Sequence, residues 1–265
     1  MIRVKLSHIT DYTYDRPVRL SPHVVRLRPA PHTRTIIESY SLSVDPARQF
    51  LNWQQDPFAN WQARLVFPEP TRQLSVRVDL MAQIRVFNPF DFFTEEYAAK
   101  YPFEYAPRLK HELLPYLAVT GDSPRLRAFA ADFTEKDLTI VDFIVALNQY
   151  VRNHVGYVIR LEPGVQSPHE TLEKKSGSCR DSAYLLVQLA RCLGLAARFV
   201  SGYLIQLKAD KPGEGELKGA ATDFTDLHAW AEIFIPGAGW VGLDATSGLL
   251  AAEGHIPLAA TPEPE

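Results

Sequence analysis

Cysteine is scarce in this sequence, because 265 residues contain only Cys179 and Cys192. Two cysteines cannot form the disulfide framework on which small exported proteins depend. The sequence has no paired CxxC motif, and its eight histidines are scattered, so no metal site is predicted. A glycine-rich phosphate loop is also lacking, so nothing indicates nucleotide binding. We therefore expect the protein to need neither a metal ion nor an organic cofactor.

Basic charge and long apolar runs are lacking as well. The formal net charge is -3, whereas proteins that bind nucleic acids or anionic membranes generally need a basic surface. No run reaches the roughly 18 apolar residues of a membrane-spanning helix. The first residues, Met1 to Asp15, contain no apolar core of a secretory signal. We expect a cytoplasmic protein with no nucleic-acid or membrane partner, and the sequence leaves its oligomeric state open.

The first part of the chain has the pattern of β-strands. Apolar and polar residues alternate there with a period of two, and proline or asparagine separates the alternating segments, which are Ile2–Leu6, Ile36–Val44 and Leu74–Val86. This pattern predicts an antiparallel, sandwich-like β domain over residues 1–106. Four of its residues are typical of an interface, although packing on a strand face accounts for them equally well: Tyr12, Tyr14, Arg26 and Arg28.

The remaining chain is mainly helical at first and then returns to strands. Ser123-Pro124 is typical of a helix start, and a second helix is expected over about 139–154. A third helix should run from Cys179 to about Leu193, because leucines form one stripe along it and Gly194 follows. Strands are expected at 197–207, 227–235 and 240–243.

The predicted fold class is therefore α+β. A second domain over 107–255 follows the β domain, and residues 256–265, rich in proline and alanine, are expected to be a linker or tail with little to pack. Residues 160–177 are expected to be a loop. Residues 208–226 are expected to form either a mobile flap over a cleft or an ordinary exposed loop.

Cys179 lies where a small loop, Ser176-Gly177-Ser178, enters the third predicted helix. The first N–H groups of a helix have no partner within it, and the helix dipole places partial positive charge there. A thiolate is stabilised at that position, so Cys179 is a candidate nucleophile. For a cysteine considered alone, a buried structural role is commoner. Cys192, about 20 Å further along the helix and beside apolar residues, fits that structural role.

A predicted hairpin carries a histidine and an aspartate. His228, Trp230 and Glu232 share one face of its first strand, and Asp244 ends the second strand after the turn at Pro236 to Gly239. Folding the hairpin brings Asp244 opposite His228 to within a residue or two. A carboxylate there can fix the imidazole tautomer and stabilise the imidazolium, as the third member of a thiol triad does.

The neighbours of these residues have several alternative roles. Trp230 either packs in the core or lies over the imidazole, and Glu232 is expected at the solvated end of its face. Arg180 and Asp181 flank Cys179, and either could pair at the helix start or support the site. A histidine on a strand is more often structural, but a histidine and an aspartate placed cross-strand, downstream of a helix-start cysteine, favour catalysis.

At these motifs the sequence resembles a known family. The segments GSCRDSAYLLVQLARCLGLAARFVSGYL and DLHAWAEIFIPGAGWVGLDATSGL resemble the bacterial transglutaminase-like superfamily, and HITDYTYDRPVRLSPHVVRLRP is similar to the β domain that precedes this core in one bacterial subfamily. The resemblance implies a papain-like core with Cys179 as nucleophile, His228 as base and Asp244 as orienting acid. The family usually has Asp-Pro-Thr at the third motif, whereas this sequence has Asp244-Ala245-Thr246. Tyr157 resembles a recurrent tyrosine and is a candidate oxyanion donor, or equally a half-buried strand residue.

The resemblance implies acyl transfer from amide bonds of protein or peptide substrates. Hydrolases and transferases share this triad and fold, so peptidase, amidase and transglutaminase activities all remain open, with hydrolysis favoured. A non-catalytic binding module is the alternative from another class. The complete Cys-His-Asp set favours an enzyme, because a scaffold gains nothing from a reactive thiol.

Overall fold

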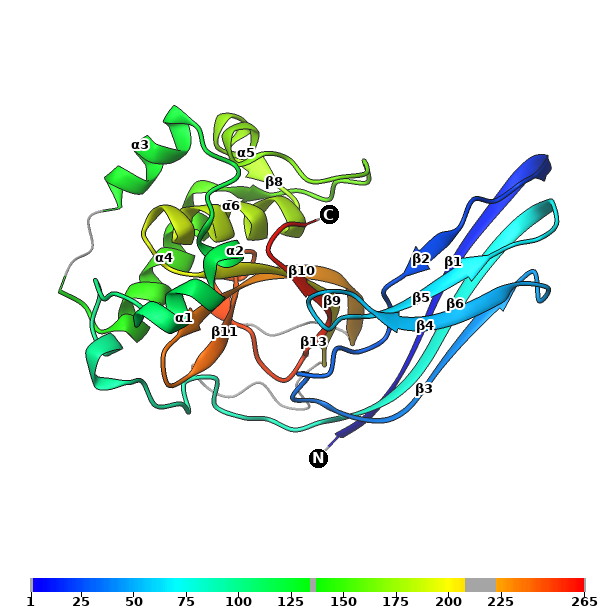
Figure 1. Cartoon of the computed structure of the whole chain (residues 1–265), viewed down its shortest axis with the longest axis horizontal. Helices are drawn as coiled ribbons and strands as arrows, with labels where there is room; N and C mark the ends of the chain where they lie inside the picture. Colours follow the sequence, from blue (N-terminus) through cyan, green and yellow to red (C-terminus); the bar gives the residue numbers. More distant parts are fainter. Residues whose placement is uncertain (1, 134–136, 208–222, 265) are drawn as a thin grey trace. The chain divides into compact units, whose positions relative to one another are not determined.

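The computed structural model describes residues 2–133, 137–207 and 223–264 (Figure 1). The chain divides into two compact units. Unit 1 comprises Met1–Val86, Gly202–Leu227 and Glu253–Ala260, and unit 2 comprises Phe87–Ser201, His228–Ala252 and Thr261–Glu265. The predicted domains at 1–106 and 107–255 stay a prediction.

Unit 1 contains two antiparallel three-stranded sheets. One has the order β1-β6-β3, made of β1 (Ile2–Val18), β6 (Thr71–Ile84) and β3 (Ile36–Asp45). The other has the order β2-β5-β4, made of β2 (His23–Val25), β5 (Trp61–Val66) and β4 (Phe50–Gln55). Alternating side chains of β6 are buried, as a period of two requires for a strand with one covered face. The predicted strands near residues 2, 36 and 74 are confirmed.

The core of unit 1 also uses later parts of the chain. Leu6, Val78 and Leu80 pack with Tyr203 from β9 (Ala197–Gln206) and Ile256 from β13 (His255–Thr261). Segment 256–265 was expected to be a linker, and this expectation is wrong for most of its length. Residues 256 to 260 are buried in β13. This segment is rich in proline and alanine, but Ile256 and Leu258 are buried in the core of unit 1. Their burial stabilises the strand.

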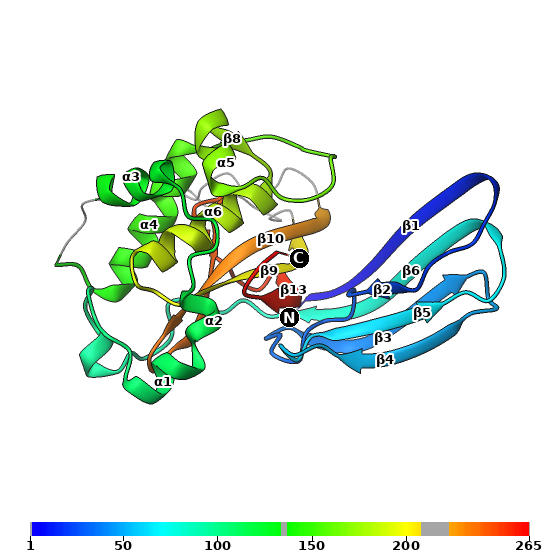
Figure 2. The same cartoon turned by 45° about the horizontal axis from the view of Figure 1, so that its top comes forward.

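Unit 2 is built around two long helices. In α4 (Ile140–His154) and α6 (Cys179–Cys192) the apolar faces pack against each other and against strands, and Figures 1 and 2 show the helices side by side. The start of α4 is capped by Thr139, whose side chain accepts a hydrogen bond from the Asp142 N–H. Shorter elements complete the helical part: η1 (Glu96–Ala98), α1 (Pro107–Glu112), α2 (Leu114–Leu117), α3 (Pro124–Asp132) and α5 (Pro168–Lys174).

A mainly antiparallel arrangement of strands completes unit 2. Strands β10 (Phe224–Ile235) and β11 (Gly239–Asp244) form a hairpin, and β12 (Leu249–Leu250) pairs with β11. The sheet order is β12-β11-β10-β9-β13, and the division between the units falls within β9 and β10. A short parallel pair joins β7 (Gly156–Tyr157) to β8 (Ser176–Gly177). The predicted α+β fold class is confirmed.

Two expectations about loops have different outcomes. Residues 160–177 are not all loop, because α5 forms within them and Ser167 caps it by accepting from the Glu170 N–H. Most of the expected flap, residues 208–222, lies outside the described residues, while Phe224 to Asp226 begin β10.

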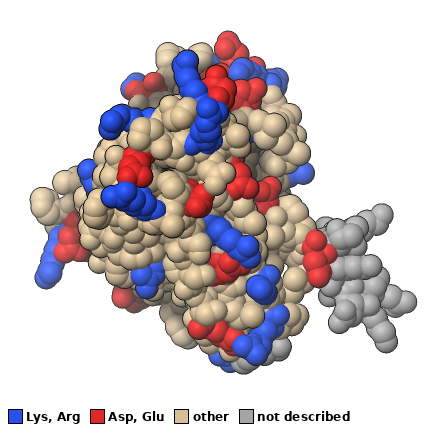
Figure 3. All heavy atoms as spheres, turned by 90° about the vertical axis from the view of Figure 1, so that its right-hand side faces the viewer, with Lys and Arg blue, Asp and Glu red and all other residues tan. Residues whose placement is uncertain are grey.

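No helix in the described part of the chain is long and apolar enough to cross a membrane. On the face drawn in Figure 3, basic and acidic side chains are interspersed rather than gathered into one large area of a single sign. That nucleic acids and membranes are not partners stays a prediction from composition.

Candidate active site

Cys179 occupies the first position of helix α6, directly after the N-cap Ser178. Its thiol is partly buried, and Cys179 packs against the main core of unit 2. The first turn of a helix offers unpaired N–H groups and partial positive charge, both of which stabilise an anion. The helix start predicted at Cys179 is confirmed, so the thiol lies at the end of the helix where the dipole places partial positive charge.

The start of α6 is fixed by the wholly buried carboxylate of Asp181. It accepts hydrogen bonds from the N–H and hydroxyl of Ser178, both at 2.8 Å, from the Gln166 N–H at 2.8 Å, and from the Arg160 guanidinium at 3.0 Å. Burial alone would raise the pKa of Asp181, but these hydrogen bonds outweigh burial and lower it. The ionised carboxylate therefore holds the residue before Cys179 in place.

Arg180 faces a different set of partners. Its guanidinium donates to the backbone oxygens of Arg160, at 3.0 Å, and Glu162, at 3.1 Å. Arg180 and Asp181 therefore both tie the loop after β7 to the nucleophile's helix. The sequence flagged the two residues at the helix start, but it gave no sign of Arg160 or Gln166, their partners.

Tyr157 lies in β7, opposite Gly177 in the parallel pairing with β8. The residue opposite Tyr157, Gly177, therefore lies two positions before Cys179 in the chain. Tyr157 itself has 52% of its surface exposed. The chain continues with exposed apolar side chains at Ile159, 80%, and Leu161, 91%. The segment beside the nucleophile's loop is thus both apolar and open to solvent.

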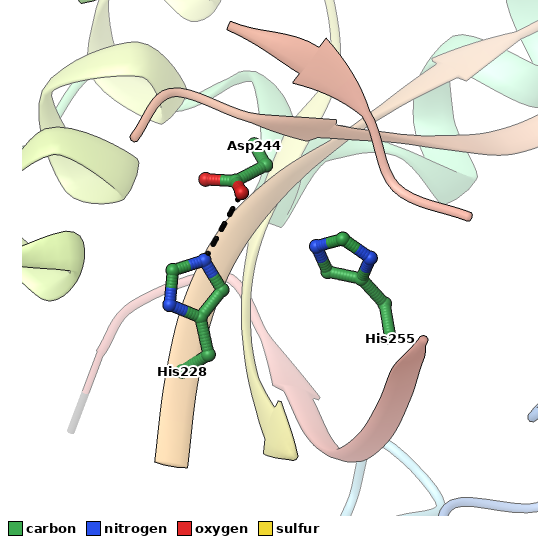
Figure 4. A group of neighbouring side chains, drawn as sticks. All are labelled: His228, Asp244 and His255. Carbon is green, nitrogen blue, oxygen red and sulfur yellow. Dashed lines mark ion pairs between the residues drawn. The ribbon is translucent and has the colours of Figure 1, made fainter. Parts of the chain in front are cut away.

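His228 and Asp244 form an ion pair within unit 2. His228 Nε2 lies 3.2 Å from Asp244 Oδ2, and both side chains are almost fully buried. Figure 4 shows the two side chains pointing toward one another, His228 from β10 and Asp244 from the end of β11; His255, also drawn there, belongs to unit 1. The expected juxtaposition of these two residues is present.

The electrostatics of His228 connect it with Cys179 as well. Burial alone would lower the pKa of His228, but hydrogen bonds to Asp244 and Cys179, with the negative charges of both groups, raise its pKa to about 9. The imidazole therefore lies within hydrogen-bonding reach of both the thiol and the carboxylate. Its protonated form is stabilised between them, which is the arrangement of a thiolate–imidazolium pair oriented by an acid.

The β10–β11 hairpin accounts for the pairing. Its register places Ala231 opposite Leu243, so the next step of the same register brings Asp244 to Trp230, two residues from His228 and on the same face. The turn requires Gly237, whose φ is +91° and where a Cβ would lie 2.6 Å from the backbone nitrogen of Glu95. The predicted offset of a residue or two agrees with this geometry.

Further residues hold the Asp244 carboxylate. The Thr246 N–H donates to Oδ1 and the Ser247 hydroxyl donates to Oδ2, at 2.8 and 2.9 Å. The side chain of Asn148, on α4, donates to the backbone oxygens of Asp244 and Leu249. Alanine in place of the family's proline at position 245 leaves these bonds intact. Asn148 was missed from the sequence, because its partners lie about a hundred residues away.

Trp230 and Glu232 are both buried on the His228 side of β10. Trp230 is 1% exposed, and its indole lies close to Gly242, which has no side chain to obstruct it. Glu232 was expected at a solvated end, but it is buried and paired with Arg198, whose guanidinium lies 4.3 Å from the Trp240 ring centre. The expectation for Glu232 is wrong because β10 is an interior strand of its sheet, so that Arg198 and Trp240 can cover this face.

Cys192 ends α6 and is also a free cysteine. It lines a pocket of about 470 Å³ with Val119 and Leu193, and burial raises the pKa of its thiol. The two cysteines of the chain thus lie at opposite ends of one helix, in different chemical surroundings.

The chain is similar in sequence to known families and proteins. A family described as "Bacterial transglutaminase-like N-terminal region" matches residues 4–83, and one described as "Transglutaminase-like superfamily" matches residues 127–245. An uncharacterised protein of Mycobacterium tuberculosis is 26% identical over 262 residues, covering 96% of this chain and 82% of that protein. A protein-glutamine gamma-glutamyltransferase of Pseudomonas aeruginosa is 30% identical over 132 residues, covering 47% of this chain and 18% of that protein.

A solved structure has the same fold. A protein of Cytophaga hutchinsonii, described as a candidate cysteine protease, superposes with a TM-score of 0.68 at 22% identity, covering 99% of this chain and 84% of that one. Cysteine-dependent activity of the protease or transglutaminase type is general to this family. The chain is therefore a member of the transglutaminase-like superfamily, with its core at residues 127–245 and a bacterial transglutaminase-like region at residues 4–83.

Proposed function

We propose that this protein is a cysteine-dependent acyl-transfer enzyme that acts on amide bonds of proteins or peptides, with Cys179, His228 and Asp244 as its triad. The observation that carries the proposal is the geometry of the site: Cys179 is the first residue of α6, and His228 Nε2 lies 3.2 Å from Asp244 Oδ2. The contacts of His228 with Asp244 and Cys179, which raise its pKa to about 9, support the same proposal. A structural histidine would not need a thiol and a carboxylate on either side. Complete retention of the three groups also argues against a non-catalytic module.

In the first half-reaction the Cys179 thiolate attacks the carbonyl carbon of a substrate amide. The negative charge that develops on the carbonyl oxygen is stabilised by N–H groups at the start of α6, including that of Cys179. Tyr157 is a second donor candidate, placed nearby by the β7–β8 register. The His228 imidazolium then gives its proton to the departing nitrogen, the C–N bond breaks, and a thioester remains on Cys179.

In the second half-reaction an acceptor resolves the thioester. Neutral His228 takes a proton from water or from a primary amine as that nucleophile attacks, and the Cys179 thiolate leaves. Asp244 keeps the imidazole oriented and stabilises its charged form throughout. Water yields a carboxylic acid, and an amine yields a new amide. We favour water as the acceptor, so that the reaction is a hydrolysis.

The exposed apolar segment that begins at Tyr157 supports a peptide substrate. Ile159 and Leu161 lie beside the loop that carries Cys179, and they can bury apolar side chains that flank the scissile amide. The cytoplasmic location expected from composition belongs to the same proposal.

The test is incubation of the full chain with a peptide library containing glutamine and apolar residues, with and without a primary amine, followed by mass spectrometry. Peptide-bond cleavage or deamidation, unchanged by the amine, is the expected result. Incorporation of the amine would assign transfer instead of hydrolysis. The opposite outcome is a wild-type sample that gives no product although its Cys179 reacts with iodoacetamide. That result would refute the proposed enzyme activity and favour the non-catalytic binding module.

A further inference from the structure

Unit 1 contains a pocket of about 630 Å³, well away in sequence from the proposed triad. Its walls come from the segment before β3, from β3 itself, and from single tryptophans on β4 and β5. The lining is mixed, with aromatic rings, hydroxyl groups and one guanidinium, and every lining residue belongs to unit 1. A concave site with a few polar groups among aromatic side chains is the usual form of a ligand pocket.

The guanidinium of Arg28 is the distinctive group of this pocket. Its central carbon lies 4.5 Å from the ring centre of Trp61, 5.3 Å from that of Trp53 and 5.9 Å from that of Tyr40. Stacking on aromatic faces fixes the plane of a guanidinium but leaves its N–H groups, which lie in that plane, to form hydrogen bonds.

Arg28 also lacks an acidic partner among the described residues. Arg26, two residues earlier, lies 3.9 Å from Asp56, and the one carboxylate in the pocket wall, Glu38, is held by Arg3 and Gln83. A partly buried cation normally pairs with an anion. The pocket is thus electrostatically suited to a ligand carboxylate, which accepts two parallel hydrogen bonds from an arginine.

Two hydroxyl groups in the pocket wall also lack a partner among the described residues. Thr33 Oγ1 and Tyr40 Oη are buried and have no hydrogen-bond partner within the described chain. Burial raises the pKa of Tyr40 to about 12 despite the opposing effect of the Arg28 charge, so this phenol stays protonated and available as a donor. Buried hydroxyls without partners are uncommon in folded proteins, and the polar groups of a bound ligand can satisfy them.

The pocket lies along strand edges. Among the described strands, β3 is the last strand of the sheet β1-β6-β3, and β4 is the last strand of β2-β5-β4. Figures 1 and 2 both show β3 and β4 running next to each other. The pocket wall includes consecutive β3 residues from Glu38 to Leu42. The outer edge of such a strand can pair with an added peptide strand, whose alternate side chains then enter neighbouring pockets.

We propose that this pocket binds an extended peptide segment that carries an aspartate or glutamate side chain. The peptide backbone pairs along the edge of β3, and its carboxylate accepts hydrogen bonds from Arg28. A side chain neighbouring the carboxylate packs against Trp53 or Trp61. This binding site is independent of the proposed triad, and it makes unit 1 a recognition surface for acidic peptides.

The test uses the full chain carrying Cys179→Ala, so that no substrate is turned over. The probes are three capped five-residue peptides, Val-Thr-Xaa-Thr-Val with Glu, Gln or Lys at the centre, and their dissociation constants are measured by calorimetry. We expect the Glu peptide to bind about 10-fold more tightly than the Gln peptide, because a charge-assisted bidentate contact is lost in the latter. The Lys peptide should bind more weakly still.

Arg28→Gln should abolish the preference for Glu, and Arg28→Lys should keep only part of it because a single ammonium cannot bond both carboxylate oxygens in a fixed plane. Arg64→Gln, at an exposed position on β5, is the matched control and should leave all three affinities unchanged. Tryptophan emission of the unmodified pocket gives a second readout, since Trp53 and Trp61 should respond to the Glu peptide even if an Arg28 variant folds poorly.

Three results would overturn the proposal. The first is equal affinity for the Glu and Gln peptides. The second is a folded Arg28→Gln variant that still prefers the Glu peptide. The third is displacement of the Glu peptide by an equal concentration of inorganic phosphate, which would reduce the pocket to a general anion site.

Discussion

The two ends of helix α6 carry the same residue type in opposite chemical roles. Cys179 at the N-terminal end lies in reach of His228 and under the influence of the helix dipole. Cys192 at the other end lines a pocket whose wall also contains Asp122 and Arg127, and burial raises the pKa of its thiol. Residue type alone therefore does not make a nucleophile. The position of the cysteine along the helix and the group placed across from its thiol decide whether it acts as a nucleophile or as a structural residue.

Replacing each cysteine by alanine tests this contrast most directly. Cys179→Ala should lower kcat by at least about 10³-fold, because no other group can form the thioester. Cys192→Ala should change kcat less than about 3-fold. It should lower the free energy of unfolding only by the amount that a small new cavity costs. Both are measured with the peptide substrate identified by mass spectrometry. A variant lacking Cys179 that retained half of the activity would break the comparison and the proposed mechanism together.

Asp244→Asn tests what distinguishes the active end of the helix beyond the thiol. The asparagine keeps the shape and can keep the Ser247 and Thr246 contacts, but it removes the charge that stabilises the imidazolium. We expect kcat to fall about 10²-fold or more. The alkaline limb of the pH profile should also move to lower pH, since Asp244 helps to raise the pKa of His228 to about 9.

The sign of this pH effect follows from the raised pKa. A histidine in the unfolded chain loses its proton near its ordinary pKa of 6.5, and His228 in the folded protein keeps its proton up to about pH 9. Its contribution to stability is fully present below pH 6.5 and is lost as the pH rises through about 9. The wild-type rate should fall over the same upper limit, because neutral His228 cannot protonate the departing amine. An alkaline limb unchanged in Asp244→Asn would show that this carboxylate does not act on His228.

The elements predicted well from the sequence are those with local signals. The start of α3 follows from its Ser-Pro cap, and the courses of α4 and α6 follow from their apolar faces. The hairpin follows from its alternation and its glycine turn. Helix α5 carries the same Ser-Pro start as α3, but its seven residues were too few for an apolar period to appear.

The features that could not be predicted are contacts between residues far apart in the sequence. Asn148 binding to the Asp244 backbone, and Arg160 binding to Asp181, depend on how the elements pack, and no local pattern reveals them. The burial of β13 is similar, because its sequence looks like a linker until Ile256 and Leu258 find partners on other strands. Tertiary packing decides these cases over local propensity.

Alkylation by iodoacetamide sharpens the comparison without a substrate. At about pH 6, where an ordinary thiol is almost entirely protonated, Cys179 should react about 10-fold or more faster than Cys192. His228→Ala should remove most of that advantage, and Cys192 should react at the same rate in both proteins. Peptide mass spectrometry follows each cysteine separately. Equal alkylation rates of Cys179 and Cys192 in the wild type would show that the thiolate–imidazolium pair of Cys179 and His228 does not form.

The smallest expected effect concerns the apolar segment beside the active end of α6. Ile159→Ser combined with Leu161→Ser removes apolar surface that is exposed in the free protein, so stability should barely change. If substrate side chains are buried there, KM for apolar peptides should rise about 5-fold, from burial worth about 25 cal/mol per Å², while kcat stays the same. The exposed Leu114→Ser, on α2, is the control and should leave KM unchanged. Binding energy that is the same for substrate and transition state affects KM and not kcat. A fall in kcat instead would therefore mean that this segment positions Cys179 through the Arg160–Asp181 ion pair. The difference between the two ends of α6 would then include the loop after β7, which holds the helix start in place.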